Sequence, residues 1–293
     1  MERVAVIFNP AAGNGKLGEL QNEIQETLET TFSTVMIYQT NRPGDGADLV
    51  QRVANDVDLI IAAGGDGTVH EVINALAPLT SRPAFAIIPG GTSNDFSREI
   101  GMIQDSLKAA EQISCKKTKW IDIGQSDQHY FLNFWGIGLI TQVSETVDLE
   151  SKQNIGRLAY YLKTIQSIGK VNAFHFKIET EKETITDNAV MVIIGNGTYI
   201  GGIRAFFPEG DIQDGLFDIL IIKEASVQAF FSMFQSKVGI QTQNMEGIIP
   251  LQAKNVKIET MPYQKIDCDG ERKSETPSTI KVLPKHIEIV IGL

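Results

Sequence analysis

The feature that most constrains this chain is an apolar run that ends in a glycine-rich turn. Residues 57–63 are almost all apolar, and Gly64-Gly65-Asp66-Gly67-Thr68 follows at once. Apolar residues then recur at helical spacing, at Val69, Val72, Ile73 and Leu76. A buried strand, a glycine turn and a helix in this order point backbone N–H groups at a phosphate. Glycines also let a ligand approach the backbone closely, so the turn predicts a nucleotide site.

Asp66 places one carboxylate inside this turn. A carboxylate there could hold Mg²⁺ beside bound phosphates, since protein-bound Mg²⁺ is commonly held by one or two carboxylates together with phosphate oxygens. The simpler interpretation is a tight turn with a solvated aspartate. Three glycines around one aspartate exceed what a connection between a strand and a helix needs, so we favour the ligand site.

The first 124 residues alternate between strand-like and helix-like stretches. Strands are predicted at 3–8, 34–40, 57–63 and 84–88, and helices at 17–28, 47–55, 69–76 and 105–113. This alternation predicts a doubly wound α/β domain that binds nucleotide. Ligands on such sheets bind at the carboxyl ends of the strands. The glycine-bearing loops after Phe8, Ala63 and Ile88 all fall at that edge.

Strand-like stretches dominate from about residue 120 onward, and many of them alternate as antiparallel strands with one wet face do. Strands are predicted at 119–123, 129–134, 173–179, 189–195, 216–222, 253–260, 264–268, 279–282 and 286–291. Helical patterns appear at 156–169 and 226–237. The sequence therefore predicts an α/β domain over residues 1–124 and a mostly-β, antiparallel sandwich-like domain over residues 125–293. We expect the active site in the cleft between them.

Composition narrows the classes of protein that remain. The net charge of −10 is spread evenly over both parts of the chain, which argues against nucleic-acid binding. The sequence has no apolar run of the roughly 18 residues that a membrane span needs, and it enters a strand directly from Met1 without a signal-peptide pattern. Two cysteines, Cys115 and Cys268, give no disulfide framework or metal cluster. We therefore expect a cytoplasmic protein.

The first loop matches two nucleotide motifs only superficially. Residues Gly13 to Gly18 fit the dinucleotide pattern, but the next strand ends in Tyr38-Gln39-Thr40, without the acidic residue that the ribose requires. The P-loop pattern fails as well, because Leu17 stands where serine or threonine is needed. We therefore predict a glycine-bearing loop that is neither a dinucleotide-binding loop nor a P-loop.

Two acidic turns stand out in the second predicted domain. Residues 208–215 include Asp211 and Asp214, whose oxygens could ligate a hard cation or simply face water. Asp267-Cys268-Asp269-Gly270-Glu271 could supply a general base and a metal ligand, although a plain Asp-Gly hairpin turn is the commoner case. The residues alone leave both questions open.

Taken together, these motifs resemble the soluble bacterial diacylglycerol kinase family, within the wider group of diacylglycerol and sphingosine kinases. The resemblance covers nearly the whole chain. It rests on Gly64–Glu71 with Val72 and Asn74, Gly91–Phe96, Asp214-Gly215 and Asp269-Gly270-Glu271. Gly-Gly-Asp-Gly-Thr alone is shared with NAD kinases, whereas its combination with the late Asp-Gly-Glu is much more specific to lipid kinases.

The resemblance implies ATP- and Mg²⁺-dependent phosphorylation of a lipid hydroxyl, with diacylglycerol as the expected acceptor and phosphatidic acid as the product. It implies that the nucleotide is held by Asn9, Pro10, Ala11, Ala12, Gly13, Thr40, Gly64, Gly65, Asp66, Gly67, Thr68, Val69, His70, Thr92 and Asn94. Asp66 would help to place Mg²⁺ and the phosphates. Glu271 would accept the proton of the lipid hydroxyl, with support from Asp269.

By the same resemblance, a structural Mg²⁺ would sit at Asp214 together with the carbonyl oxygens of Asp211 and Leu216. The chain departs from the family's pattern at two positions. Ala12 replaces the usual serine of the first loop, which removes one hydroxyl near the phosphates. Gln213 replaces the first member of the usual aspartate pair, which removes one carboxylate near the metal. Neither change removes a group that the implied chemistry requires.

A lipid substrate must be reached at a membrane, so we expect transient peripheral membrane contact. Candidates are Arg204–Phe207 and Phe230–Phe234, although core positions are the commoner case for such aromatics.

The sequence does not decide between a monomer and a homodimer. The alternatives are an NAD kinase of the same fold, and a regulator that senses ATP without turnover. The intact Asp66, Asp269 and Glu271 argue against a dead enzyme.

Overall fold

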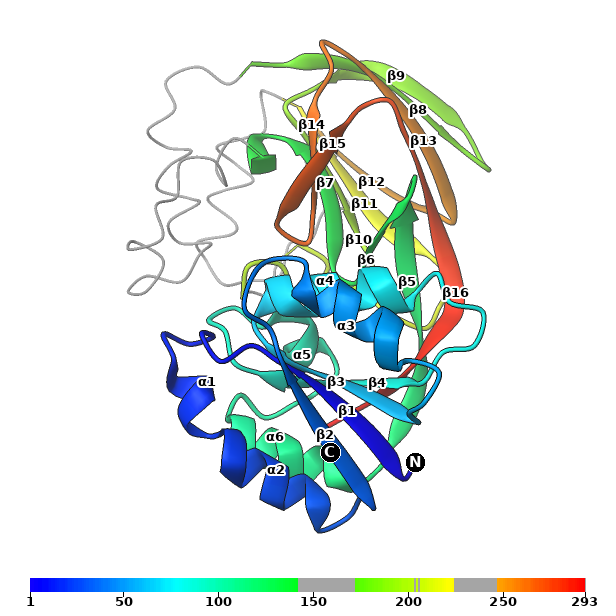
Figure 1. The fold of residues 1–293 in the computed structure, drawn as a ribbon. Coiled ribbons are helices and arrows are strands. Elements are labelled where there is room, and N and C mark those ends of the chain that lie inside the picture. The colour runs from blue at the N-terminus through cyan, green and yellow to red at the C-terminus, as the bar shows by residue number, and fades with distance from the viewer. Residues whose placement is uncertain (142–171, 203, 205, 224–246, 293) are drawn as a thin grey trace. The chain divides into compact units, whose positions relative to one another are not determined.

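The computed structural model describes residues 1–141, 172–202, 204, 206–223 and 247–292 (Figure 1). Among these residues, no helix is both long enough and apolar enough to cross a membrane. The chain divides into two compact units, residues 1–121 with 285–293 and residues 122–284. The boundary predicted after residue 124 falls within the strand β5 (Thr118–Ser126).

The first unit contains a parallel sheet made from the strands that the sequence predicts. The strand order is β2 (Thr34–Gln39), β1 (Arg3–Phe8), β3 (Leu59–Gly64), β4 (Ala84–Pro89) and the end of β16 (Ser278–Val290). Each of these neighbours runs parallel to the next. β3 and β4 are buried along their whole length, as parallel strands covered on both faces are.

Helices cover both faces of this sheet. α2 (Gln21–Glu29) packs with α6 (Ser106–Ser114) on one face, and α3 (Asp45–Val53) packs with α4 (Asp66–Leu76) on the other (Figure 1). The helix predicted over residues 17–28 is interrupted, because Leu20 leaves the helical conformation after the short α1 (Lys16–Glu19). The short α5 (Asp95–Glu99) was not predicted. The doubly wound α/β fold expected for this part of the chain is confirmed.

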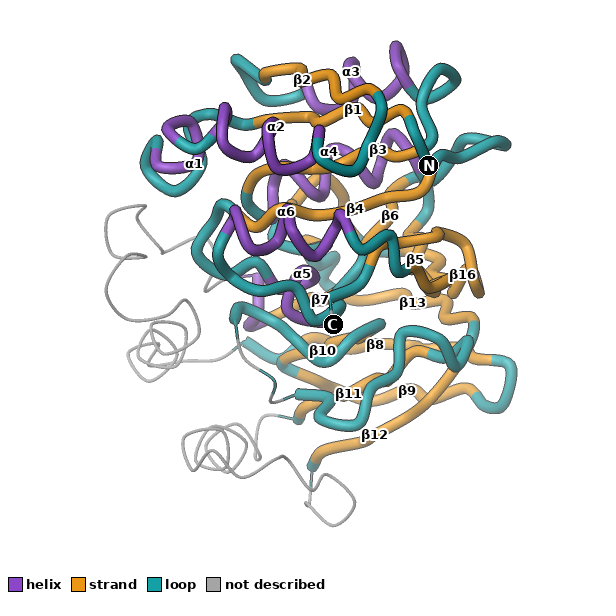
Figure 2. Tube along the Cα trace, turned by 90° about the horizontal axis from the view of Figure 1, so that it is seen from below, coloured by secondary structure: helices purple, strands orange, loops and turns teal. Residues whose placement is uncertain are grey.

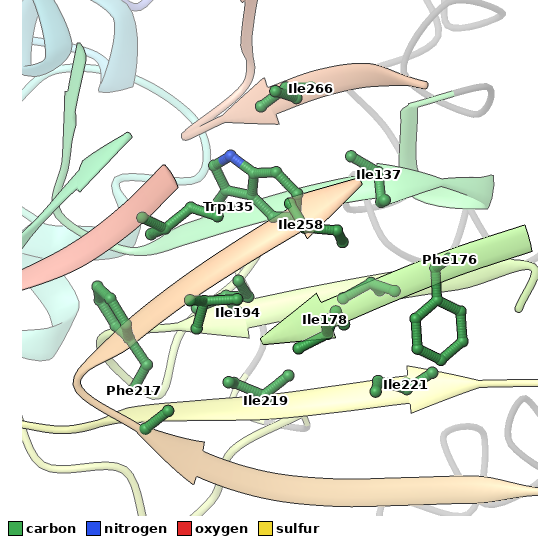
Figure 3. Packing of buried hydrophobic residues seen from close by; sticks show 14 of the residues in the cluster. Trp135, Ile137, Phe176, Ile178, Ile194, Phe217, Ile219, Ile221, Ile258 and Ile266 are labelled. Carbon is green, nitrogen blue, oxygen red and sulfur yellow. The ribbon is translucent and has the colours of Figure 1, made fainter. Parts of the chain in front are cut away.

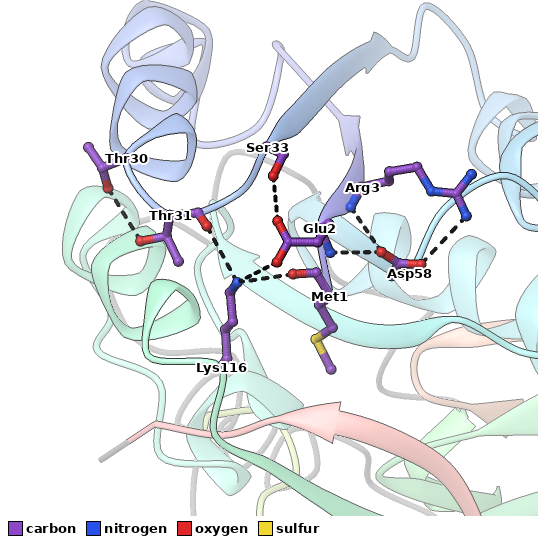
Figure 4. A network of polar contacts seen from close by, with 8 residues as sticks. All are labelled: Met1, Glu2, Arg3, Thr30, Thr31, Ser33, Asp58 and Lys116. Atoms are coloured by element: carbon purple, nitrogen blue, oxygen red, sulfur yellow. Dashed lines mark hydrogen bonds and ion pairs between the residues drawn. The ribbon is translucent and has the colours of Figure 1, made fainter.

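A polar network fixes the start of β1 (Figure 4). The Asp58 carboxylate accepts the backbone amides of Glu2 and Arg3 at 2.7 and 3.0 Å, and it lies 3.6 Å from the Arg3 guanidinium. The two amide hydrogen bonds hold the pKa of Asp58 below its ordinary value. Lys116 Nζ donates to the Met1 carbonyl oxygen at 3.0 Å and lies 3.8 Å from the Glu2 carboxylate. These contacts join β1 to the segments before β3 and after α6.

Strands make up most of the described part of the second unit (Figure 2). One antiparallel sheet has the order β12 (Ile248–Ala253), β11 (Phe217–Ile222), β10 (Met191–Gly195), β7 (Phe134–Gly138), β14 (Lys265–Cys268) and β15 (Glu271–Glu275). A second antiparallel set has the order β9 (Thr184–Ala189), β8 (Phe174–Thr180), β13 (Asn255–Met261) and the first part of β16. The short β6 (His129–Phe131) pairs with β5.

Side chains from both sheets form one apolar core in this unit (Figure 3). Trp135 of β7, Phe176 of β8 and Phe217 of β11 are each fully buried in the same cluster. Along β13 every second residue is buried, which is the alternation expected of a strand with one wet face. The antiparallel, sandwich-like fold predicted for this part of the chain is confirmed.

Several strand boundaries differ from the prediction. The single strand expected over 189–195 is the end of β9 followed by β10, and the strand expected over 253–260 is the end of β12 followed by β13. These turns contain no glycine or proline to mark them. The two strands expected over 279–282 and 286–291 are one long strand, β16. The helices predicted over 156–169 and 226–237 lie outside the described residues.

Candidate functional site

The carboxyl ends of β1, β3 and β4 bring three loops of the first unit together. Asn9 follows β1; its Nδ2 donates to the Thr68 hydroxyl at 3.1 Å, and its Oδ1 accepts the Ala11 amide at 3.1 Å. Gly13 has a φ of +62°, and a Cβ at that position would lie 2.8 Å from the Gly90 carbonyl oxygen. The first loop, which includes Pro10 and Ala12, therefore contacts both of the later loops.

Glycines are required where the loops after β3 and β4 touch. A Cβ on Gly91 would lie 2.7 Å from the Gly65 Cα. Asn94 shapes the second of these loops, because its Oδ1 accepts the Gly91 amide and its Nδ2 donates to the Gly91 carbonyl, both at 2.9 Å. Only glycine allows two backbones to approach this closely. The structure thus explains why Gly65 and Gly91 both occur in predicted nucleotide-binding loops.

Asp66 is the first residue of α4, and backbone amides already contact its carboxylate. Oδ1 accepts the Asp95 amide at 2.9 Å, and Oδ2 accepts the Asn94 amide at 3.2 Å. These hydrogen bonds tie the glycine turn after β3 to the start of α5. Each carboxylate oxygen carries two lone pairs, so one amide bond to each does not by itself exclude a role beside Mg²⁺ and phosphates. That role of Asp66 stays a prediction.

The other predicted nucleotide residues of the first unit differ in exposure. Thr92 is exposed, and Thr40 is half-buried, with its amide bonded to the Phe8 carbonyl at 2.8 Å. Val69 and His70 are only 8% and 4% exposed, so their side chains belong to the interior of the unit. We therefore expect these two residues to meet a nucleotide through backbone atoms.

Asp122 is a residue of the second unit that the sequence reasoning missed. It is 1% exposed, and its Oδ2 accepts the Gly215 amide at 2.6 Å. Its own amide donates to the Ile212 carbonyl at 2.7 Å, and its carbonyl accepts Asn196 Nδ2 at 3.0 Å. The acidic turn before β11 is thus folded against a buried carboxylate. The sequence did offer a signal for Asp122, because it is a lone aspartate between two isoleucines in a predicted strand. Charged residues are rarely buried, so an aspartate in such a strand indicates a specific structural or functional role.

Asp211 and Asp214 lie in the turn that was predicted to hold a metal ion. Asp211 Oδ1 accepts the Gln213 amide, and Asp214 Oδ1 accepts the Leu216 amide, both at 2.9 Å. Burial raises the pKa of Asp214, and the charges of three nearby aspartates act in the same direction. A cation beside these carboxylates would relieve that repulsion. In the described part of the chain, no group of three or more His, Cys, Asp or Glu is arranged to hold a metal, so backbone carbonyls would have to contribute.

Asp269 and Gly270 form the tip of the hairpin between β14 and β15. Cys268 pairs with Glu271 across the tip, and φ is +52° at Asp269 and +92° at Gly270. Positive φ at both central residues is typical of the two-residue Asp-Gly turn. Asp267 Oδ1 accepts the Gly270 amide at 2.7 Å and so supports the turn. The motif therefore forms an Asp-Gly hairpin turn.

The Asp269 side chain also anchors this hairpin. Its carboxylate accepts three consecutive amides, from Leu132 at 2.7 Å and from Asn133 and Phe134 at 2.9 Å. The tip is thereby fixed to the start of β7, and Glu271, which follows directly, is half-buried. By fixing the hairpin, these contacts are consistent with the prediction that Asp269 supports Glu271. The role of Glu271 as a base stays a prediction.

The aromatic residues considered for membrane contact lie in the interior where the structure describes them. Phe206 and Phe207 are 4% and 5% exposed, so the core interpretation is confirmed for this pair. Arg204 is exposed and donates to the Pro208 carbonyl at 2.7 Å. The segment Phe230–Phe234 lies outside the described residues.

Comparisons with known proteins identify the family. The family described as "Diacylglycerol kinase catalytic domain" matches residues 3–126, and the one described as "YegS C-terminal NAD kinase beta sandwich-like domain" matches residues 136–291. A diacylglycerol kinase of Bacillus subtilis (strain 168) is 31% identical over 293 residues, which cover 99% of this chain and 97% of the relative. The chain belongs to the diacylglycerol kinase family.

Further family members match over most of their length. A diacylglycerol kinase of Staphylococcus haemolyticus (strain JCSC1435) is 29% identical over 285 residues, covering 97% of this chain and 86% of the relative. The crystal structure of a diacylglycerol kinase from Bacillus anthracis str. Sterne is 40% identical with a TM-score of 0.89, covering 99% of this chain and 97% of that one. The family resemblance that the sequence motifs indicated is therefore confirmed.

Proposed function

We propose that this member of the diacylglycerol kinase family transfers the γ-phosphoryl group of ATP to the free hydroxyl of diacylglycerol and so yields phosphatidic acid. The observation that carries the proposal is the convergence of the loops after β1, β3 and β4 at the start of α4. A helix N-terminus reached through glycines suits the phosphates of a nucleotide.

In this proposal the nucleotide binds at the carboxyl edge of the first unit's sheet. The backbone of Gly64–Thr68 binds the phosphates, and the loops that contain Asn9 and Asn94 flank them. Asp66 helps to place the Mg²⁺ that accompanies ATP. Phosphoryl transfer mainly requires positioning and charge neutralisation. A protein with a net charge of −10 needs a cation to reduce its repulsion from ATP.

Glu271 is the proposed base. As the lipid oxygen attacks the γ-phosphorus, the bond from phosphorus to the bridging oxygen of ADP breaks, and the hydroxyl proton passes to the Glu271 carboxylate. Asp269 holds the hairpin that carries this base. A positioned base of this kind contributes about 10² to 10⁴ in rate.

A structural Mg²⁺ belongs to the same proposal. Asp214 would hold it with the carbonyl oxygens of Asp211 and Leu216, which are the hard oxygen ligands that Mg²⁺ takes. Burial raises the pKa of Asp214, and the charges of Asp218, Asp211 and Asp122 add to the shift. A cation held there would offset the repulsion among these carboxylates. The cation would stabilise the turn before β11. We also propose a cytoplasmic enzyme that contacts the membrane transiently when it takes up its lipid.

A three-way assay of ATP consumption tests this function. Purified protein with Mg²⁺ and ATP receives diacylglycerol in mixed micelles, NAD, or no acceptor. We expect ADP to form with diacylglycerol alone. Consumption with NAD would favour an NAD kinase of the same fold. ATP binding without consumption under any condition would favour a regulator that only senses the nucleotide.

A further inference from the structure

The turn that joins β13 to β14 (Figure 1) carries the two most exposed large apolar side chains among the described residues. Met261 is 67% exposed and Tyr263 is 65% exposed, and Pro262 between them is exposed as well. The other exposed side chains of this kind, Ile103 and Trp120, stand singly in the first unit. A single exposed apolar residue is normal, whereas an apolar cluster indicates a contact surface. We call residues 261–263 the apolar turn.

The apolar turn ends a strand face that is otherwise polar. Every second residue of β13 is exposed, and those before Met261 are Asn255, Lys257 and Glu259. Lys257 and Glu259 form an ion pair at 3.0 Å on this face. The strand thus keeps the one wet face of an antiparallel strand until its last residue, where a methionine takes the place of a polar side chain.

Polar contacts hold the apolar turn in a defined conformation. Thr260 and Thr276 are both buried, and their hydroxyls share a hydrogen bond. The Thr276 hydroxyl accepts the Gln264 amide at 2.9 Å, and the Thr276 amide donates to the Gln264 carbonyl at 2.9 Å. Gln264 Nε2 donates to the carbonyls of Pro262 and Tyr263 at 3.1 and 3.2 Å. Because these two carbonyls already have partners, moving the turn out of water costs less.

The charges around the apolar turn are compatible with a lipid surface. The whole chain has a net charge of −10, so most of its surface is repelled by anionic lipids. Residues 260–266 contain no Asp or Glu, and their one charged residue is Lys265. Glu275 is the cross-strand partner of Lys265, and His175 is that of Met261. These neighbours together carry no net negative charge.

We propose that the apolar turn is a docking site for a lipid bilayer. Met261 and Tyr263 enter the interfacial layer, where tyrosine buries its ring and keeps its hydroxyl in contact with water. The inference rests on the proposed function, because only an enzyme with a lipid substrate needs such a contact.

β14 connects this docking site to the hairpin that precedes Glu271. The path from Tyr263 to Cys268 spans about 16 Å at ordinary strand geometry. Half of the hydrocarbon core of a bilayer, the depth that one acyl chain fills, is about 15 Å. A lipid whose chain ends stay at the bilayer surface can therefore raise its hydroxyl to the level of the hairpin.

The double variant Met261→Ser/Tyr263→Ser tests the docking site by vesicle sedimentation. The vesicles contain phosphatidylcholine and phosphatidylglycerol but no diacylglycerol, so that binding is measured apart from turnover. Loss of both side chains from the interface should weaken binding at least about tenfold. Ile103→Ser, which removes an exposed apolar side chain from the first unit, is the matched control and should bind as the wild type does. Thermal unfolding of all three proteins checks that they are folded.

Tyr263→Trp tests the same contact without removing it. A tryptophan in the apolar turn should lose fluorescence on vesicles whose phosphatidylcholine is brominated in its acyl chains. The wild type is the reference, because Trp135 is buried and Trp120 lies in the first unit. We expect quenching in the variant well above that of the wild type.

Activity assays separate docking from chemistry. With diacylglycerol carried in the vesicles, the apparent KM of the double variant should rise at least about tenfold. With short-chain diacylglycerol dissolved as monomers, its kcat/KM should equal that of the wild type. An equal loss with both forms of the lipid would place the two residues in the chemistry and would overturn the docking site.

Other results also decide the inference. Unchanged vesicle binding in the double variant, or equal quenching in Tyr263→Trp and wild type, would overturn it. A wild type that phosphorylates dissolved diacylglycerol but binds no vesicles would overturn it and leave the proposed function intact. If the double variant loses self-association in analytical ultracentrifugation but still binds vesicles, the turn is a contact between copies of this chain instead. A wild type that docks through the turn but phosphorylates neither form of diacylglycerol would refute the proposed function alone.

Discussion

The glycine turn of the first unit and the Asp-Gly hairpin of the second use an aspartate in a similar way. Asp66 accepts two backbone amides and Asp269 accepts three. Asp66, however, begins a helix and joins two loops at the carboxyl edge of the first unit's sheet. Asp269 lies at the tip of a hairpin, two residues before Glu271, and fixes that tip to the start of β7. The first arrangement surrounds the proposed nucleotide site, and the second lies beside Glu271, the proposed base.

The difference shows how phenotypes at the two positions should be read. A carboxylate recognised from a motif can be a structural anchor as well as a chemical group. A substitution at Asp66 should therefore change both ATP affinity and turnover, whereas a substitution at Glu271 should change turnover alone. Because either residue could also stabilise the fold, the folding of each variant must be measured beside its activity.

Asp66→Ala should have the largest effect. We expect turnover to disappear and Mg-ATP binding to weaken, because the carboxylate in the glycine turn is lost. Stability should fall by about 2 kcal/mol, the scale of losing hydrogen bonds to a charged group. The protein should stay folded, since the apolar face of α4 remains buried. Turnover and thermal unfolding of the purified variant measure both, and near-normal activity would contradict the nucleotide assignment.

Glu271→Gln should affect turnover alone. It keeps the size of the side chain and removes its basicity, so lipid phosphorylation should fall by at least about a hundredfold. ATP affinity should change little, because the proposed nucleotide contacts lie in the first unit. A variant that keeps more than about a tenth of wild-type turnover at saturating lipid and ATP would assign the proton to solvent or to Asp269 instead.

Asp214→Ala should act on stability through Mg²⁺. A metal that binds only the folded state raises its stability. We expect wild-type protein to melt about 2 °C or more higher in Mg²⁺ than in chelator. The variant should melt equally in both and lose part of its activity. The absence of any Mg²⁺ effect in wild type would remove the structural metal from the proposal.

Asp58→Asn should have the smallest effect. Amide hydrogen bonds lower the pKa of Asp58 from its ordinary value of 3.8 in the folded state. The ionised carboxylate therefore contributes stability above pH 3.8, and this contribution is lost as the pH falls through the lower folded value. At pH 7 the loss in the variant should stay under about 1 kcal/mol, because the side chain is partly exposed.

Chemical unfolding across pH 2 to 7 measures this difference, with Asp56→Asn at a nearby exposed position as the control. The gap between wild type and Asp58→Asn should close in acid. A gap that is constant over the whole range would show that the carboxylate charge is not its cause.

Local sequence patterns were sufficient for much of the first unit. Apolar runs that end in glycine-bearing loops predicted β1, β3 and β4. They thereby also predicted the three loops that meet at α4. The same patterns could not place β15 (Glu271–Glu275), a polar segment that becomes a strand through its hairpin partner.

Contacts between distant residues account for most of what the sequence did not predict. Asp122 meets Gly215 across 93 positions, and Glu71 meets Gly44 across 27. The end of β16 pairs with β4 at Ile289 and Phe85, which returns the last residues to the first unit. Periodicity reports which face of an element is buried, but it carries no information about which remote amide a carboxylate will accept.

The proposed phosphorylation of diacylglycerol has one direct test. The direct measurement incubates the protein with ATP labelled at the γ-phosphate and a total-lipid extract, and then identifies the labelled lipid. We predict one main product, phosphatidic acid, which is absent with Asp66→Ala and at least about a hundredfold weaker with Glu271→Gln. Label in a different lipid, or no labelled lipid from a protein that binds ATP, would contradict the claim.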